Sequence, residues 1–368
     1  MRFLYQKWDP RFDQSKSKPA FDRLNEIFQQ LLYISSGDVG QALKWLTELD
    51  KEYNLTAEYD NYGIADFIKE LEERGYIKYD AEEVEVVITR KMERSLRTRA
   101  LEEVFRNLRK GGAGQHKTAH QGKGLEREPE TRAWQFGDDA NQFDSTGTLL
   151  NALRNSPIDQ FSLTENDLRV YETDHNTSMA TVLMIDLSHS MILYGEDRIT
   201  PAKKVAMALA ELILSRYAKD SLEIIAFGND VWKVSIDELP YLSVGPYHTN
   251  TLAGLELARH LLQRKKHANK QIFMITDGKP SAMYENGKLY KNSFGLDRKI
   301  VNKVLNEATQ CRKEKITITT FMIAQDPYLQ NFVREMTEAN KGRAYFSGLN
   351  KLGGFVLEDY VRNRKKNV

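Results

Sequence analysis

The sequence predicts an α/β protein, with a doubly wound, Rossmann-like sheet in its C-terminal half and a mainly helical region before it. An unbroken apolar run at residues 182–185 ends abruptly at Asp186, which is typical of a strand that is buried on both faces of a parallel sheet. The same pattern returns at residues 271–276, directly before Asp277. From about residue 167 onwards, strand patterns alternate with helical patterns, which favours a parallel sheet covered by helices.

The other elements of this half follow in chain order. Residues 167–173 are expected to form an edge strand that leads into the central strand, and Pro201 is well placed as the first residue of a long helix. Asn286 and Gly287 predict the turn of a hairpin. We further expect helices at residues 202–218, 252–263, 296–313, 327–338 and 351–364, and strands at residues 222–227, 231–235, 316–323 and 343–346.

The N-terminal part predicts a mainly helical, winged-helix-like layout. Apolar residues at helical spacing indicate three short helices, a short alternating strand and a longer helix, at residues 21–32, 39–49, 64–74, 84–88 and 92–108. Basic side chains gather where this region ends, at Arg90, Lys91, Arg94, Arg97 and Arg99. They form either a phosphate-contacting face or the solvated face of a helical docking module.

A glycine-rich stretch at residues 110–124 separates the two halves. It contains almost no apolar side chains, so it predicts a flexible linker. His116 and His120 lie within it and are assigned to the linker rather than to a metal site. We therefore expect a helical domain at residues 1–109, a linker and anchoring segment at residues 110–166, and an α/β domain at residues 167–368.

The composition is that of a soluble globular protein. A net charge of +1 gives the whole chain no preference for nucleic acid or for an acidic substrate. No apolar run approaches the length of a membrane span, and the first ten residues lack the apolar core of a signal peptide. The single cysteine, Cys311, cannot form an internal disulfide and falls in a helical pattern, as an inert thiol. These features predict a cytoplasmic protein without membrane contact.

Hard oxygen ligands follow the two buried strands. Asp186, Ser188 and Ser190 offer one carboxylate and two hydroxyl groups from a single turn, and Asp277 follows the second strand. Thr249 lies where a further helix begins. Ligands of open α/β sheets bind beyond the carboxyl ends of the strands, and oxygen donors of this kind suit Mg²⁺ or Mn²⁺. The alternative is that the two acids cap loops and the serines form turns.

These residues resemble, in order and spacing, the metal-ion-dependent adhesion site (MIDAS) of von Willebrand factor A (VWA) domains. The matching motifs are Asp-x-Ser-x-Ser at residues 186–190, a later threonine, and Thr-Asp-Gly at residues 276–278, within about half of the chain. The resemblance implies that Ser188, Ser190 and Thr249 contact the metal. It also implies that Asp186 and Asp277 hold the ion directly or through water. An open position on the ion would accept an Asp or Glu side chain of a partner protein.

The overall layout is similar to that of stand-alone bacterial VWA proteins that serve AAA+ ATPases of the magnesium-chelatase and MoxR-like kind. That resemblance implies a non-enzymatic adaptor for such an ATPase or its client. The sequence has no Gly-x-x-x-x-Gly-Lys-Ser/Thr phosphate loop, so nucleotide hydrolysis would come from a separate subunit. Two alternatives stay open: a nucleic-acid-associated protein that uses the basic N-terminal half, and a metal-dependent hydrolase. For a hydrolase, His248 is the near candidate for a general base, since His189 is expected to point away from the two serines.

Overall fold

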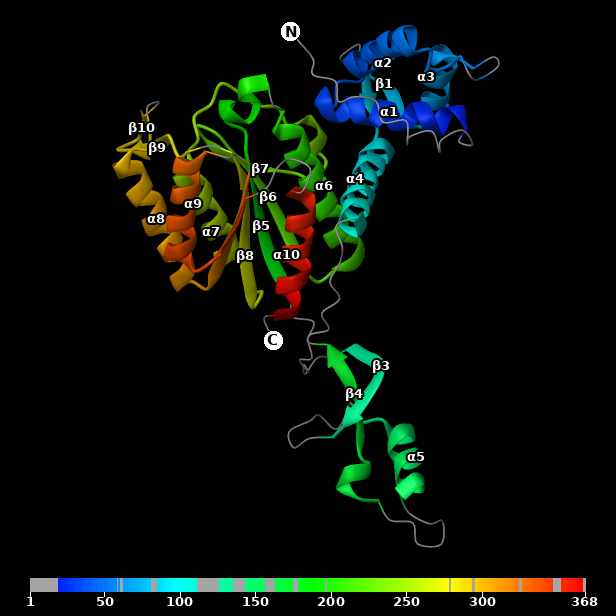
Figure 1. Cartoon of the computed structure of the whole chain (residues 1–368), viewed down its shortest axis with the longest axis vertical. Helices are drawn as coiled ribbons and strands as arrows, with labels where there is room; N and C mark the ends of the chain where they lie inside the picture. Colours follow the sequence, from blue (N-terminus) through cyan, green and yellow to red (C-terminus); the bar gives the residue numbers. More distant parts are fainter. Residues whose placement is uncertain are drawn as a thin grey trace.

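The chain forms three parts that follow one another in sequence (Figure 1). The predicted linker beyond residue 110, including His116 and His120, falls outside the residues that can be described. The computed structural model describes residues 19–366, apart from residues 58, 60–61, 81–84, 111–125, 135–142, 156–162, 175–177, 196, 278, 293–294, 324–325 and 347–351.

The C-terminal part is built on a six-stranded sheet, in the order β12-β11-β8-β5-β6-β7. All neighbouring strands are parallel except β6 and β7, which form a hairpin. From β5 the chain moves to one side of the sheet, and from β8 it moves to the other, so the strand order reverses between these two strands. The predicted doubly wound sheet is confirmed. Its strands are β5 (Met179–Asp186), β6 (Ser221–Phe227), β7 (Val231–Val234), β8 (Asn269–Thr276), β11 (Ile316–Met322) and β12 (Arg343–Phe346).

Helices cover both faces of this sheet, because β5 is buried along its whole length and sends apolar side chains both ways. Leu183 and Ile185 join the core beneath α6 and α10, whereas Val182 and Met184 join the core beneath α7, α8 and α9. Figure 1 shows these two helical layers on opposite sides of the strands. The helices are α6 (Ile199–Arg216), α7 (Thr251–Gln263), α8 (Arg298–Lys313), α9 (Pro327–Asn340) and α10 (Leu352–Lys366).

The N-terminal module, residues 19–110, is mainly helical, as predicted, and packs onto α6. Its apolar side chains belong to the same core as those of α6. Lys204 on α6 donates to Gln30 Oε1 at 2.6 Å, and Lys203 donates to Ser36 Oγ at 3.1 Å. The elements of the module are α1 (Ala20–Ile34), α2 (Val39–Tyr53), α3 (Ile64–Glu73), an antiparallel hairpin of β1 (Ile77–Asp80) and β2 (Glu85–Ile88), and α4 (Arg90–Lys110).

Part of the basic stretch on α4 serves this packing. The guanidinium of Arg97 is mostly buried and contacts Glu211 Oε2 at 3.5 Å and Asp237 Oδ1 at 3.2 Å, both in the C-terminal part. Lys91 donates to the carbonyl of Arg74 and lies over the ring of Tyr76. Two of the five basic side chains are thus held by contacts within the chain.

The middle part corrects one sequence prediction. Residues 167–173 were expected to form an edge strand of the main sheet. β4 (Arg169–Asp174) does form there, but it pairs antiparallel with β3 (Glu126–Ala133) in a separate two-stranded sheet. The short helix α5 (Ser145–Asn155) packs beside this sheet, since Thr148 on α5 accepts the backbone N–H of Arg169 at 2.8 Å. The reason is that β5 already has a parallel partner on each side, so no edge next to it is open to β4.

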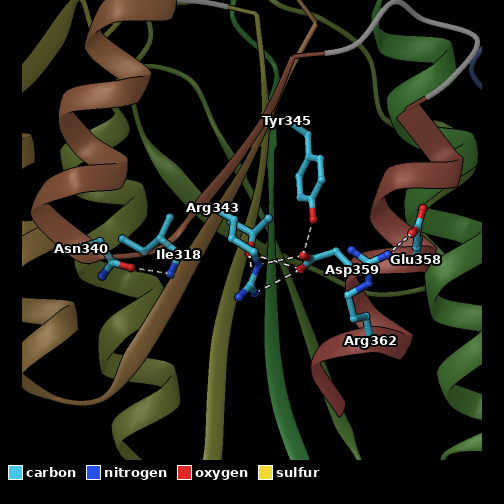
Figure 2. A network of polar contacts seen from close by, with 8 residues as sticks. Ile318, Asn340, Arg343, Tyr345, Glu358, Asp359 and Arg362 are labelled. Atoms are coloured by element: carbon cyan, nitrogen blue, oxygen red, sulfur yellow. Dashed lines mark hydrogen bonds and ion pairs between the residues drawn. The ribbon is translucent and has the colours of Figure 1, made fainter. Parts of the chain in front are cut away.

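Asp359 on α10 anchors the last helix to the outer strands of the sheet (Figure 2). This carboxylate is buried, and it receives the guanidinium of Arg343 at 2.7 Å and the hydroxyl of Tyr345 at 2.8 Å, both from β12. A buried charge is tolerated in this way, because opposing charge and hydrogen bonds replace the water that it loses. The network therefore fixes α10 against the face that α6 also covers.

Two expectations from the composition concern Cys311 and the membrane. Cys311 is buried on α8, and burial raises the pKa of its thiol to about 12, in line with the expected packed side chain. Among the helices that the structure describes, no segment has the length and apolarity of a membrane span.

Candidate metal centre

Asp186 ends β5 at the point where the strand order reverses, and its side chain has no exposure to solvent. Asp186 Oδ1 accepts the backbone N–H of Ser188 at 2.9 Å, and Oδ2 accepts the hydroxyl of Thr276, at the end of β8, at 2.5 Å. The two bonds come from the turn after β5 and from the neighbouring strand. They fix the carboxylate at the carboxyl edge of the sheet, where open α/β sheets bind ligands.

The two serines connect Asp186 with the second acid. Ser188 Oγ lies 3.0 Å from Ser190 Oγ, and the Ser190 hydroxyl donates to Asp277 Oδ1 at 2.8 Å. Mg²⁺ binds oxygen ligands at about 2.1 Å in octahedral geometry, in which neighbouring ligands lie about 3.0 Å apart. The spacing of these hydroxyl and carboxylate oxygens is therefore that of neighbouring ligands around one such ion.

Thr249 is buried in the loop that precedes α7 and is held beside the segment that follows Asp277. Its backbone N–H donates to Ser281 Oγ at 3.0 Å, and its carbonyl accepts the N–H of Ser281 at 2.9 Å. The next residue, Asn250, caps α7 and also donates its backbone N–H to the carbonyl of Gly228 at 2.8 Å. Backbone hydrogen bonds thus hold the loop that carries Thr249 on both sides. The other four predicted ligands, Asp186, Ser188, Ser190 and Asp277, are linked to one another by hydrogen bonds.

The two carboxylates are poorly compensated as they stand. Burial, together with the nearby charge of Asp277, raises the pKa of Asp186 to about 7. Burial also raises the pKa of Asp277, against the lowering effect of hydrogen bonds from Ser190 and Arg198. A bound divalent ion would remove this penalty, since it would be the largest charge at the site and would favour both ionised carboxylates.

Arg198 is a member of the site that the sequence prediction missed. Its guanidinium contacts Asp277 Oδ2, and both side chains are largely buried. Arg198 stands directly before α6, where the positive end of the helix dipole disfavours a cation. That unfavourable position was a signal in the sequence that this arginine has a partner elsewhere.

The donor set fits a hard divalent ion. The candidate ligands are carboxylate and hydroxyl oxygens, the class that Mg²⁺ and Mn²⁺ prefer. Within the part of the chain that the structure describes, no group of three or more His, Cys, Asp and Glu side chains could hold a metal. A histidine- or thiolate-rich site of the zinc type is therefore not formed by these residues.

Two histidines lie near the site in the sequence. The side chain of His189 is exposed, in accord with the expected direction away from the serines. Burial and the charge of Lys291 lower the pKa of His248, and the backbone of His248 is held by Asn229 Oδ1 at 2.8 Å. Among the contacts of the described residues, neither imidazole bonds to the acids or serines of the site.

Comparison with known proteins identifies two segments. A family model described as "Rv0959-like protein, vWA domain" matches residues 179–361, and one described as "Rv0959-like protein, third domain" matches residues 126–173. The uncharacterized proteins Rv0959 of Mycobacterium tuberculosis and Mb0984 of Mycobacterium bovis are each 33% identical over 283 residues, which cover 74% of this chain. The matched part is 41% of each relative, so the chain spans about two fifths of their length.

Solved structures with a similar fold include VWA domains. The vWF domain of the type V pili tip protein Mfa5 from Porphyromonas gingivalis covers 53% of this chain and 98% of its own, at 12% identity and a TM-score of 0.44. The SpRpn10 VWA domain covers 50% of this chain and 95% of its own, at 15% identity and a TM-score of 0.37. At these identities the likeness concerns the fold alone. The match of the family model to residues 179–361, which form the doubly wound sheet and its helices, identifies this part of the chain as a VWA domain.

Proposed function

We propose that this protein is a non-enzymatic, metal-dependent interaction adaptor. In this proposal Asp186, Ser188, Ser190, Thr249 and Asp277 form a MIDAS that holds one Mg²⁺ or Mn²⁺. The ion supplies a Lewis-acidic position for a carboxylate of a partner protein. The observation that carries the proposal is the run of oxygen contacts from Ser188 Oγ through Ser190 Oγ to Asp277 Oδ1, at the spacing of neighbouring octahedral ligands. The backbone N–H of Ser188 fixes the carboxylate of Asp186 beside it.

The charge of the site supports a carboxylate as the group that binds. Asp186, Asp277 and Arg198 together carry one negative charge, so a divalent ion leaves the site positive. The serine and threonine ligands are neutral and do not reduce that charge further. A partner's Asp or Glu would complete both the charge and the coordination of the ion.

We further propose that the partner is a separate AAA+ ATPase of the chelatase or MoxR-like kind, or its client, in the cytoplasm. This rests on the family resemblance of the layout and on the absence of a phosphate loop from the sequence. The packing of the N-terminal module onto α6 is compatible with it, because the module then adds a surface beside the VWA domain. No reaction is assigned to this chain.

Calorimetric titration with Mg²⁺ and with Mn²⁺ tests the metal site. Wild-type protein is expected to bind one ion, and Asp186→Asn is expected to bind none, because the amide keeps the shape of the side chain but loses its charge. Asp66→Asn, at an exposed capping position in the N-terminal module, is the matched control and should bind like wild type. Equal binding by wild type and Asp186→Asn would contradict the proposed site.

Capture of a purified AAA+ ATPase of the chelatase or MoxR-like kind, from the same organism, tests the partner. Retention of the purified ATPase on the immobilised full chain should require Mg²⁺ and should be lost in chelator and with Asp186→Asn. Retention that is equal in chelator and in Mg²⁺ would place the interface elsewhere on the chain.

A further inference from the structure

Three exposed aromatic side chains lie beside the candidate metal centre, and we call them the aromatic rim: Trp232, Tyr247 and Tyr284. They are 39%, 37% and 46% exposed. The rings of Trp232 and Tyr247 meet edge to face, with their centroids 6.4 Å apart. The Tyr284 hydroxyl contacts Asp230, two residues before Trp232. Three separate segments therefore meet here: β7, the loop before α7, and β9 (Ala282–Glu285) of the hairpin after Asp277.

Two glycines leave the space that the ring of Tyr247 occupies. Its ring lies directly on Gly228 and Gly245, where an added Cβ would stand 2.8 Å and 2.1 Å from the nearest ring or side-chain atoms. A side chain at either glycine would displace the ring. The Tyr247 carbonyl also accepts the backbone N–H of His189 at 3.1 Å. This hydrogen bond connects the backbone of Tyr247 with the turn that carries Ser188 and Ser190.

The rim is held rigidly although much of its surface faces solvent. The hairpin that bears Tyr284 turns at Asn286 and Gly287, both with positive φ as such a turn requires, and β9 pairs with β10 (Lys288–Lys291). Lys299 on α8 contacts Glu285 at 2.7 Å and so joins the hairpin to the domain. Rigid, exposed Tyr and Trp side chains give large contact area at low cost in conformational entropy, which is why they dominate binding surfaces.

Carboxylate binding by a metal does not distinguish one exposed acid from another. An aromatic surface two residues from Thr249 can make that distinction, because it contacts the residue next to the acid in the bound segment. Neighbouring residues of an extended chain are about 3.8 Å apart between Cα atoms, so the residue next to a metal-bound acid stays close to the loop that carries Tyr247 and Thr249. The net positive charge of the metal-loaded site attracts the acid, and the rim offers the adjoining apolar contact.

We propose that the metal centre and the aromatic rim together recognise an exposed segment of another protein in which an Asp or Glu stands next to an apolar side chain such as Leu, Met or Pro. This rests on the proposed metal-dependent function and adds the sequence preference of the site. The acid binds the ion, and its apolar neighbour packs against Tyr247 and Trp232.

Selection from a phage-displayed library of random dodecapeptides tests this preference. The full chain is immobilised with Mg²⁺, and bound phage are eluted with chelator. Selected peptides should contain an acidic residue with an apolar neighbour. On Tyr247→Ala and on Trp232→Ala the acid should persist while the apolar neighbour is no longer enriched. Tyr79→Ala, at an exposed position in the N-terminal module, is the control and should select the same peptides as wild type.

A synthetic version of the peptide that binds most tightly then measures how much the apolar neighbour contributes to affinity. Replacing its apolar neighbour by Ser should weaken Mg²⁺-dependent binding to wild type about tenfold, and to the two rim variants less than twofold. Tyr247→Phe keeps the ring and should behave like wild type. Trp232 lies on β7, an edge strand of the sheet, where truncation of a side chain disturbs the core least. Trp232→Ala therefore still tests the proposal if Tyr247→Ala lowers the stability of the protein.

The possible outcomes separate the two proposals. Enrichment of an acid without a preferred neighbour, or an apolar preference that survives in both rim variants, would overturn the role of the rim and leave the metal-dependent function standing. Chelator-eluted peptides without an acidic residue would overturn the proposed function itself. Peptides that match a segment of this chain would identify a second copy as the partner and would overturn recognition of another protein.

Discussion

Replacement of Asp186 by Asn should stabilise the metal-free protein, which is the opposite of the usual result for a buried side chain with two hydrogen bonds. The amide can keep both contacts: its carbonyl oxygen accepts the N–H of Ser188, and its NH₂ group can donate to the hydroxyl oxygen of Thr276. The substitution therefore removes the charge and little else. In the metal-free state that charge destabilises the folded protein, because the side chain is fully buried and lies close to Asp277.

The magnitude follows from the pKa of Asp186, which burial and Asp277 raise from 3.8 to about 7. Between these values the folded state holds a proton that the unfolded state has lost, so stability falls as the pH rises from about 4 to about 7. Each pH unit of this difference is worth about 1.4 kcal/mol, so the ionised carboxylate costs the folded protein roughly 4 kcal/mol at pH 8. Asp186→Asn avoids that cost.

Urea unfolding in chelator at pH 5 and pH 8 measures the effect. The free energy of unfolding of Asp186→Asn should exceed that of wild type by up to about 4 kcal/mol at pH 8, and the difference should shrink toward pH 5. Excess Mg²⁺ should stabilise wild type by about 2.7 kcal/mol at one hundred times its Kd and leave the variant unchanged. A variant that is less stable than wild type at pH 8 in chelator would refute the burial penalty on which this reasoning depends.

Further predictions concern three positive side chains that are largely buried. Arg198→Gln should destabilise the metal-free protein by about 3 kcal/mol in urea unfolding, because it leaves Asp277 buried without its ion-pair partner, and an unchanged midpoint would contradict the pairing. Burial lowers the pKa of Lys203 from 10.5 to about 8, so the unfolded state binds the extra proton between these values and stability should rise with pH across this window. Lys203→Met should lack that rise when unfolding is followed at pH 8 and pH 10, and an identical slope in both proteins would count against it. Arg97→Ala should speed amide hydrogen exchange in α4 and α6, since it removes contacts to Glu211 and Asp237; unaltered exchange there would mean that apolar packing alone holds the N-terminal module.

Much of the C-terminal fold could be predicted because its signals are local. The apolar runs before Asp186 and Asp277 identify strands that are buried on both faces, and the acids that end them mark the functional edge of the sheet. The hairpin at Asn286 and Gly287 was predictable for the same reason: the turn chemistry lies in two adjacent residues.

The missed features depend on partners that are distant in the sequence. β3 is almost entirely polar and shows no alternation of apolar and polar side chains, so nothing in it predicts pairing with β4, which begins more than thirty residues later. The helical patterns of the N-terminal module show that one face is buried, but not that α6 covers it. Lys203 on α6 is buried and donates to the carbonyl of Leu242 at 3.0 Å, a partner thirty-nine residues later in the chain.

Anomalous diffraction from a crystal of the full chain grown with Mn²⁺ tests the central claim most directly. One strong anomalous peak should lie within coordination distance of the hydroxyl oxygens of Ser188 and Ser190, with Asp186 and Asp277 bound to the ion directly or through water. The same crystal form of Asp186→Asn should lack that peak. A Mn²⁺ peak located away from these residues, or none in wild-type crystals at millimolar Mn²⁺, would contradict the assignment of this edge of the sheet as a metal centre.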